Sequence, residues 1–167
     1  MNLTQALFDG LIISVLLYGW ILVILKINPR FELKSYPKSI TDAVPKQTPD
    51  EKKRFLLLAI PMLVVIITYV GYTMITTYQD SYYTFGILFL HLLVIFLIAN
   101  LVDLFIMDWL LFCTIKPAFM RMPGTDKHHI GYRDYRYHFI GFLKGTIISV
   151  AAATVIAAVI WIIFRLS

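Results

Sequence analysis

The chain has 167 residues, of which 59% are hydrophobic and only 15% are charged, and its mean hydropathy is +0.77. Soluble domains are about 45–50% apolar and about 25% charged, so this composition excludes an ordinary soluble enzyme and predicts one polytopic membrane bundle. The net charge of +5 lies beside the hydrophobic segments, where it indicates topology and attraction to anionic lipid headgroups, with no nucleic acid as partner.

The first hydrophobic segment covers residues 6–25 and ends before Asn28-Pro29-Arg30. It lacks a basic n-region and a small-residue cleavage site, so we expect it to be a retained anchor rather than a signal peptide. The connector that follows, residues 26–54, contains four prolines. That density predicts a surface loop with one short helical turn rather than a packed subdomain.

The second helix has a clear start signal. Thr48-Pro49-Asp50-Glu51 supplies a capping hydroxyl, a proline at the first helical position and a glutamate three residues after the cap. We therefore expect this helix to begin near Pro49 and to span the membrane over residues 55–78. Pro61 lies inside that span and predicts a kink, with the freed carbonyl bonded by a neighbouring helix.

The third hydrophobic segment has 34 residues, 82–115, without Pro, Lys or Arg. A helix of that length extends about 50 Å, whereas the hydrocarbon core of a bilayer is about 30 Å thick. The prediction is a span over residues 83–104 whose helix continues to residue 115. A second connector at residues 116–138 and a last span at residues 139–164 complete the chain.

These segments predict an all-α fold for residues 1–167. It is a single domain of four transmembrane helices with a long third helix and two connectors. The first connector holds eight Lys and Arg residues, and the second connector with its flanks holds six, out of 15 in the chain. By the positive-inside rule, both connectors are cytoplasmic and both termini are extracytoplasmic.

The last span carries a stripe of small residues at every fourth position. Residues four apart share one helical face, and small residues let helices approach closely in lipid. The stripe predicts a helix contact with another part of this chain, with a second copy in a homo-oligomer, or with a membrane partner protein. Its members are Gly141, Gly145, Ser149, Ala153 and Ala157.

Polar residues inside the third hydrophobic segment are the first candidates for function. At about 100° per residue, Asn100, Asp103 and Asp108 share one face of an α-helix, and His91 points to the opposite side. Ionisable groups at membrane depth usually face the bundle interior and often mark function. The structural alternative is that Asp103 pairs with a basic residue of the first connector, and that Asp108 lies among the headgroups and pairs with Lys116 or Arg121. For His91, we expect a hydrogen bond to another helix.

The second connector adds nitrogen and oxygen donors on the same side of the membrane. These donors are His128, His129, Asp134 and His138. Together with Asp103 and Asp108 they make six potential ligands for a divalent metal such as zinc or iron, although the spacing matches no metal motif. The candidate catalytic residues are Asp103, Asp108 and His138. The weak candidates for metal ligands are Asp103, Asp108, His128, His129 and His138.

The run from 132 to 138 alternates aromatic and basic residues just before the last span. It predicts an interfacial belt in which rings lie at headgroup level and guanidinium groups contact lipid phosphate. The alternative is a surface that recognises the phosphate of a lipid-linked or nucleotide substrate. The lipid-headgroup candidates are Tyr132, Arg133, Tyr135 and Arg136.

Several short motifs resemble small four-span bacterial membrane proteins that have no assigned activity. The motifs are Asn28-Pro29-Arg30, Tyr36-Pro37-Lys38, Asp108-Trp109, Pro123-Gly124-Thr125 and the run from 135 to 145. The resemblance covers most of the chain and implies a bacterial plasma membrane. It implies no substrate, cofactor or catalytic residue.

Three functions remain open from the sequence. The favoured hypothesis is a small integral plasma-membrane protein that acts as an accessory or interaction protein. The alternative is a membrane-embedded enzyme that acts on a lipid or phosphate-bearing substrate at the cytoplasmic face. A second alternative is a small proton-coupled transporter that uses His91 or Asp103.

Overall fold

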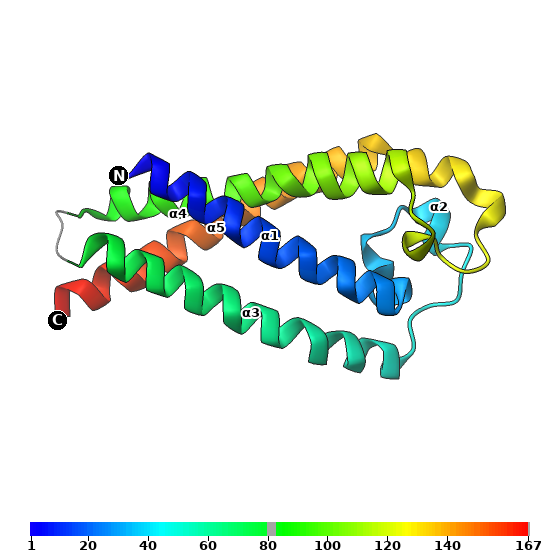
Figure 1. The fold of residues 1–167 in the computed structure, drawn as a ribbon, viewed down its shortest axis with the longest axis horizontal. Coiled ribbons are helices and arrows are strands. Elements are labelled where there is room, and N and C mark those ends of the chain that lie inside the picture. Colours follow the sequence, from blue (N-terminus) through cyan, green and yellow to red (C-terminus); the bar gives the residue numbers. More distant parts are fainter. Residues whose placement is uncertain (80–82, 167) are drawn as a thin grey trace.

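Four long helices run along the molecule in the computed structural model. It describes residues 1–79 and 83–166, without the side chains of residues 126–129. No strand occurs in the described part of the chain, so the predicted all-α fold is confirmed. The helices long and apolar enough to cross a membrane are α1 (Leu3–Ile27), α3 (Pro49–Tyr78), α4 (Phe85–Val102) continued by η2 (Asp103–Ile115), and α5 (Tyr135–Leu166). Both chain ends lie at one end of the bundle, and both connectors lie at the other (Figure 1).

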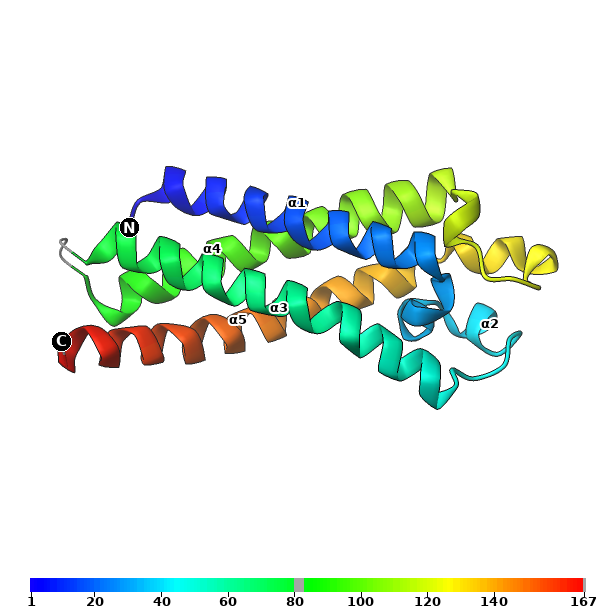
Figure 2. The same cartoon turned by 60° about the horizontal axis from the view of Figure 1, so that its bottom comes forward.

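The α4 helix is at the centre of the packing, with α1 and α5 as its main neighbours. The α3 helix is different, because its buried residues all come from its last third: Val70, Thr73, Met74 and Tyr78. Its remaining two-thirds present apolar side chains outward, as expected for a helix covered by lipid. Figures 1 and 2 show α3 diverging from the other helices towards the connector end.

The predicted start of α3 is confirmed. Thr48 Oγ1 accepts from the Glu51 backbone N–H at 3.1 Å, and Glu51 Oε2 accepts from the Thr48 N–H at 2.8 Å. The helix continues through Pro61. Trp20 Nε1 of α1 donates to the carbonyl of Leu58 at 2.9 Å, which is the carbonyl next to the one that Pro61 deprives of its helical donor.

The end of the third span differs from the prediction. Instead of one α-helix to residue 115, α4 changes at Asp103 into a π-helix, η2, that runs to Ile115. At its end the Lys116 N–H bonds the Leu111 carbonyl at 2.7 Å, five residues back, and Lys116 adopts a left-handed conformation. The helix ends at Lys116 as predicted, but the predicted α-helical geometry of residues 103–115 was wrong.

The first connector is more ordered than its prolines predicted. It forms η1 (Pro29–Ser35) and α2 (Lys38–Thr41), and it buries the side chains of Phe31, Leu33 and Ile40. The prediction failed because these apolar residues lie between the prolines at a spacing that lets them reach the bundle end.

The second connector forms η3 (Ala118–Met120) and η4 (Asp126–Arg133), and it packs on the first. At Gly131, a Cβ would lie 2.5 Å from Ser39 Oγ and 2.9 Å from Ile40 Cδ1. The Tyr36 hydroxyl donates to the Met120 carbonyl at 2.7 Å. The two connectors therefore form one packed cap on the bundle.

The small-residue stripe of α5 lies mainly against α4 of the same chain. Ser149, Ala153 and Ala157 are buried there. Gly145 approaches Asn100, whose Nδ2 donates to the Phe142 carbonyl at 3.0 Å and to Thr146 Oγ1 at 3.1 Å. Gly141 is an exception to the predicted contact, because a Cβ placed there meets nothing within 4 Å. It lies one turn beyond the end of the close approach.

Candidate functional site

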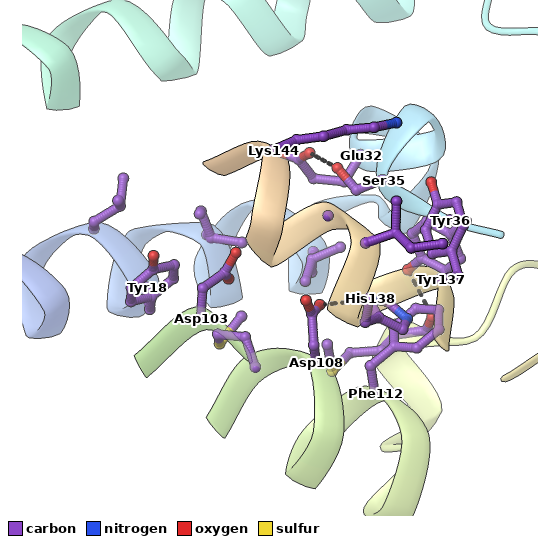
Figure 3. A pocket seen from close by; sticks show the side chains of 17 residues that line it. Tyr18, Glu32, Ser35, Tyr36, Asp103, Asp108, Phe112, Tyr137, His138 and Lys144 are labelled. Carbon is purple, nitrogen blue, oxygen red and sulfur yellow. Dashed lines mark hydrogen bonds and ion pairs between the residues drawn. The ribbon is translucent and has the colours of Figure 1, made fainter. Parts of the chain in front are cut away.

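A cavity of about 510 Å³ lies at the connector end of the bundle. It is bounded by α1, η1, the π-helix η2, Met120 of η3 and the first turns of α5 (Figure 3). The walls of the cavity are mainly apolar. Five acidic or basic side chains also line it: Glu32, Asp103, Asp108, His138 and Lys144. Pockets of about 300–1,000 Å³ with a few placed polar groups are typical of small-molecule sites.

The π-helix explains why two carboxylates share this cavity. Asp103, Met107, Asp108 and Phe112 all line it, at a spacing of four and five residues. In a π-helix the hydrogen bonds join residues five apart, so residues four and five apart face the same side. In an α-helix Asp103 and Asp108 would be about 140° apart, at about 100° per residue. The shared face was predicted, but Asn100 does not belong to it and bonds α5 instead.

The Asp108 and His138 side chains are in direct contact between η2 and α5. Asp108 Oδ1 lies 2.8 Å from His138 Nδ1. His138 is 4% exposed, and its other ring nitrogen, Nε2, is buried without a hydrogen-bond partner among the described residues. The ring packs on Phe112, with the ring centroids 4.8 Å apart. Two of the three predicted catalytic candidates are therefore in direct contact.

The third candidate, Asp103, lines the same cavity without a partner. No hydrogen bond or ion pair joins it to any other residue that the structure describes. The structural alternative, in which Asp103 pairs with a basic residue of the first connector, does not occur among the described residues. The connector contributes a carboxyl group here instead, because Glu32 and not a lysine or arginine of that segment lines the cavity.

Sequence reasoning missed Glu32, Lys144 and Tyr18 as lining residues. Figure 3 shows Glu32 and Lys144 across the cavity from Asp103. Burial raises the pKa of Glu32 above its ordinary value of 4.5, and the hydrogen bond from Ser35 only partly opposes this rise. A signal for Lys144 was present in the sequence, since it is a cation one helical turn inside an apolar span.

The headgroup candidates divide into two groups. Arg133, Tyr135 and Arg136 are exposed, as an interfacial belt requires. Tyr132 was assigned wrongly, because it is buried and its hydroxyl accepts from the Met122 N–H at 2.7 Å. It helps to hold the connector cap together, so its ring is not available to lipid headgroups.

The predicted metal site does not form among the side chains that the structure describes. No group of three or more His, Cys, Asp or Glu residues is close enough there to hold a metal ion. His128 and His129 have side chains outside the described residues. The remaining candidates give one paired and one separate carboxyl group with a single histidine, which is fewer donors than a structural metal site uses.

A second polar cluster is buried at the other end of the bundle. Asp9 of α1 and His91 of α4 are both 0% exposed, with 3.4 Å between Asp9 Oδ2 and His91 Nε2. The Tyr69 hydroxyl donates to Asp9 Oδ1 at 2.9 Å, and the Tyr78 hydroxyl lies 2.8 Å from His91 Nδ1. The predicted interhelical hydrogen bond of His91 is confirmed. His91 and Asp103 are 12 residues apart along the helix, about 18 Å at 1.5 Å per residue, so they belong to different sites.

Comparison of the chain with protein-family models, with curated proteins and with solved structures finds no match. The resemblance indicated by the short sequence motifs is therefore not supported by a family match, and function has to be argued from the geometry.

Proposed function

We propose that this chain is an integral membrane protein that binds a small amphipathic molecule in the cavity at its connector end. The observation that carries the proposal is the cavity itself. It joins an apolar wall from α1 to a polar wall from η2 and α5, at the end of the four apolar helices. An amphipathic ligand matches both walls, since its chain lies against the apolar side and its head meets the ionisable groups.

We further propose that the cavity is on the cytoplasmic side of a plasma membrane. The support is the distribution of positive charge, because 14 of the 15 Lys and Arg residues lie in the two connectors and their flanks. Cytoplasmic loops carry such an excess by the positive-inside rule. Both termini would then be extracytoplasmic.

The geometry gives less support to the other functions considered. The α5 stripe is not free to bind a partner protein, since Ser149, Ala153 and Ala157 are buried against α4. An accessory protein would therefore need to bind its partner through a different surface. A transporter that uses His91 or Asp103 is supported only by the burial of these groups, and the two lie in separate polar clusters. An enzyme at this site would use Asp108 and His138 as catalytic groups. A binding site would use the same two residues, so their contact does not favour catalysis over binding.

Ligand binding is tested by filling the cavity. Gly141 lines the cavity, and an added Cβ meets nothing within 4 Å, so Gly141→Leu fills space without a clash at the backbone. Gly19→Leu is the matched control, because a Cβ at Gly19 also meets nothing within 4 Å and Gly19 does not line the cavity. Native mass spectrometry of protein purified in mild detergent is expected to show a retained amphiphile on wild type and Gly19→Leu only. Identical bound species on wild type and Gly141→Leu would contradict the proposal.

Orientation is tested by labelling single cysteines on intact cells. The buried Cys113 is first replaced by alanine. A membrane-impermeant maleimide is expected to label Gln79→Cys, which directly follows α3 at the end with the termini (Figure 1), and not Ala43→Cys in the first connector. Labelling of Ala43→Cys alone would reverse the orientation.

A further inference from the structure

The polar wall of the cavity has an excess of acidic groups. Three carboxyl side chains, Glu32, Asp103 and Asp108, line it together with one lysine, Lys144. Lys144 forms no ion pair with any described residue, so it does not neutralise a particular carboxylate. The two exposed arginines of the neighbouring segment, Arg133 and Arg136, are not among the lining residues. An anionic head would meet three carboxyl groups here, whereas a cationic head would be matched by them.

The contact with Asp108 leaves one ring nitrogen of His138, Nε2, available to a ligand. Asp108, when ionised, is only an acceptor, so the proton between the two side chains is carried on His138 Nδ1. In the neutral ring, Nε2 is then an acceptor. This nitrogen is buried without a partner in the described part of the chain, on a side chain that is only 4% exposed. An unsatisfied buried acceptor is costly, and a ligand N–H relieves that cost.

Aromatic rings complete the surroundings of the head. Tyr18, Tyr36, Phe112 and Tyr137 all line the cavity. The hydroxyls of Tyr18 and Tyr36 already donate to the carbonyls of Ala99 and Met120, at 2.8 and 2.7 Å. These two residues therefore offer the ligand their rings rather than their hydroxyl groups. Aromatic rings around a site attract ammonium groups through the negative charge on their faces.

We infer that the ligand carries a cationic amine, and that its ammonium group lies between Asp103 and the Asp108–His138 pair. This inference rests on the proposed function, since it names the class of amphiphile that the cavity takes. An ammonium group has N–H donors for both an unpaired carboxylate and a histidine nitrogen, which no alcohol, carboxylate or phosphate head supplies with the matching charge. An aminophospholipid and a free alkylamine share this chemistry.

Three chain-matched probes separate the head-group classes in maltoside micelles: dodecylammonium, dodecanol and dodecanoate. Dodecylammonium is expected to raise the thermal midpoint of the wild-type protein, and the other two are not. Asp103→Asn is expected to weaken dodecylammonium binding about ten- to hundred-fold, the loss of one charge-assisted hydrogen bond. The same variant should fold normally, because Asp103 has no partner among the described residues to lose.

Further arms identify the source of the amine and the site. Short-chain phosphatidylethanolamine and phosphatidylglycerol are added as competitors of dodecylammonium. Competition by phosphatidylethanolamine alone would assign the amine to a lipid. No competition by either lipid would assign it to a free alkylamine. Gly141→Leu is expected to abolish dodecylammonium binding, and Gly19→Leu to retain it. Equal binding of all three dodecyl probes, each lost in Gly141→Leu, would overturn the amine assignment and leave the proposed function intact. Binding unaffected by Gly141→Leu, or no binding of any probe, would overturn both.

Discussion

The close approach of α4 and α5 gives the sharpest prediction on stability. At Gly145, a Cβ would lie 3.1 Å from Asn100 Cγ and 3.3 Å from Asn100 Nδ2, and closer still to Asn100 Oδ1. In Gly145→Ala the Asn100 amide must move, which breaks its hydrogen bonds to Phe142 and Thr146. Overpacking costs about 1–3 kcal/mol, and each interhelical hydrogen bond in a membrane is worth about 0.6 kcal/mol. The expected loss of unfolding free energy is therefore about 2–4 kcal/mol.

The matched control is Gly141→Ala, one turn earlier on the same helix. An added Cβ there meets nothing within 4 Å, so the higher helix propensity of alanine predicts no loss and a gain of up to about 1 kcal/mol. Reversible unfolding in mixed micelles titrated with denaturing detergent measures both variants. In an Asn100→Ala background, Gly145→Ala should cost much less, because the clashing amide is absent. Equal stability of Gly145→Ala and Gly141→Ala would refute the close contact.

Three further predictions follow from other contacts in the structure. His91→Leu should cost about 1–3 kcal/mol, because Asp9 and Tyr78 each lose a buried polar partner while Asp9 keeps its hydrogen bond from Tyr69. The Asp9→Leu/His91→Leu double variant should cost less than the two single changes together, and additive losses would show that the pair is not coupled. Gly131→Ala should lower stability by about 1–3 kcal/mol, because its Cβ would lie too close to the buried Ile40 side chain as well as to the Ser39 hydroxyl, and an unchanged thermal midpoint would contradict that packing. The raised pKa of Glu32 means that the folded state binds its proton more tightly than the unfolded state, so wild-type stability should fall as pH rises above 4.5 and through the raised pKa. Glu32→Gln should lack this fall, and parallel pH profiles of the two proteins would contradict the prediction.

The spans and several helix ends were predictable because local chemistry determines them. Membrane-crossing helices require long apolar runs, and four such runs were present. The start of α3 follows from the Thr48–Glu51 capping box, which involves only neighbouring residues. Apolar length and capping are properties of short stretches, so a sequence displays them directly.

The π-helix was not predictable from the same pattern. An apolar segment supports either α or π hydrogen bonding, and the residue types of η2 do not indicate which of the two forms. The shared face of Asp103 and Asp108 was still correct, although for a different geometric reason. Asn100 was misplaced because it precedes the change in helix type and follows the α pattern of α4.

Contacts between distant residues account for the remaining differences. Asp9 and His91 are 82 residues apart in the sequence. Asp9 is an acid inside an apolar span, so the reasoning applied to Asp103 would have marked it for the bundle interior. No comparable signal marked Tyr132, because an aromatic residue beside a span suits both a membrane interface and a packed connector.

The claim that the cavity binds an amine-bearing amphiphile is tested most directly by an experimental structure of the protein in nanodiscs of native lipid. Density for a head group is expected within hydrogen-bond distance of Asp103 and of His138 Nε2, with its chain along the α1 wall. Density for a head that touches only Lys144, with the carboxyl groups solvated, would contradict the amine assignment. An empty or water-filled cavity under the same conditions would contradict the binding function as a whole.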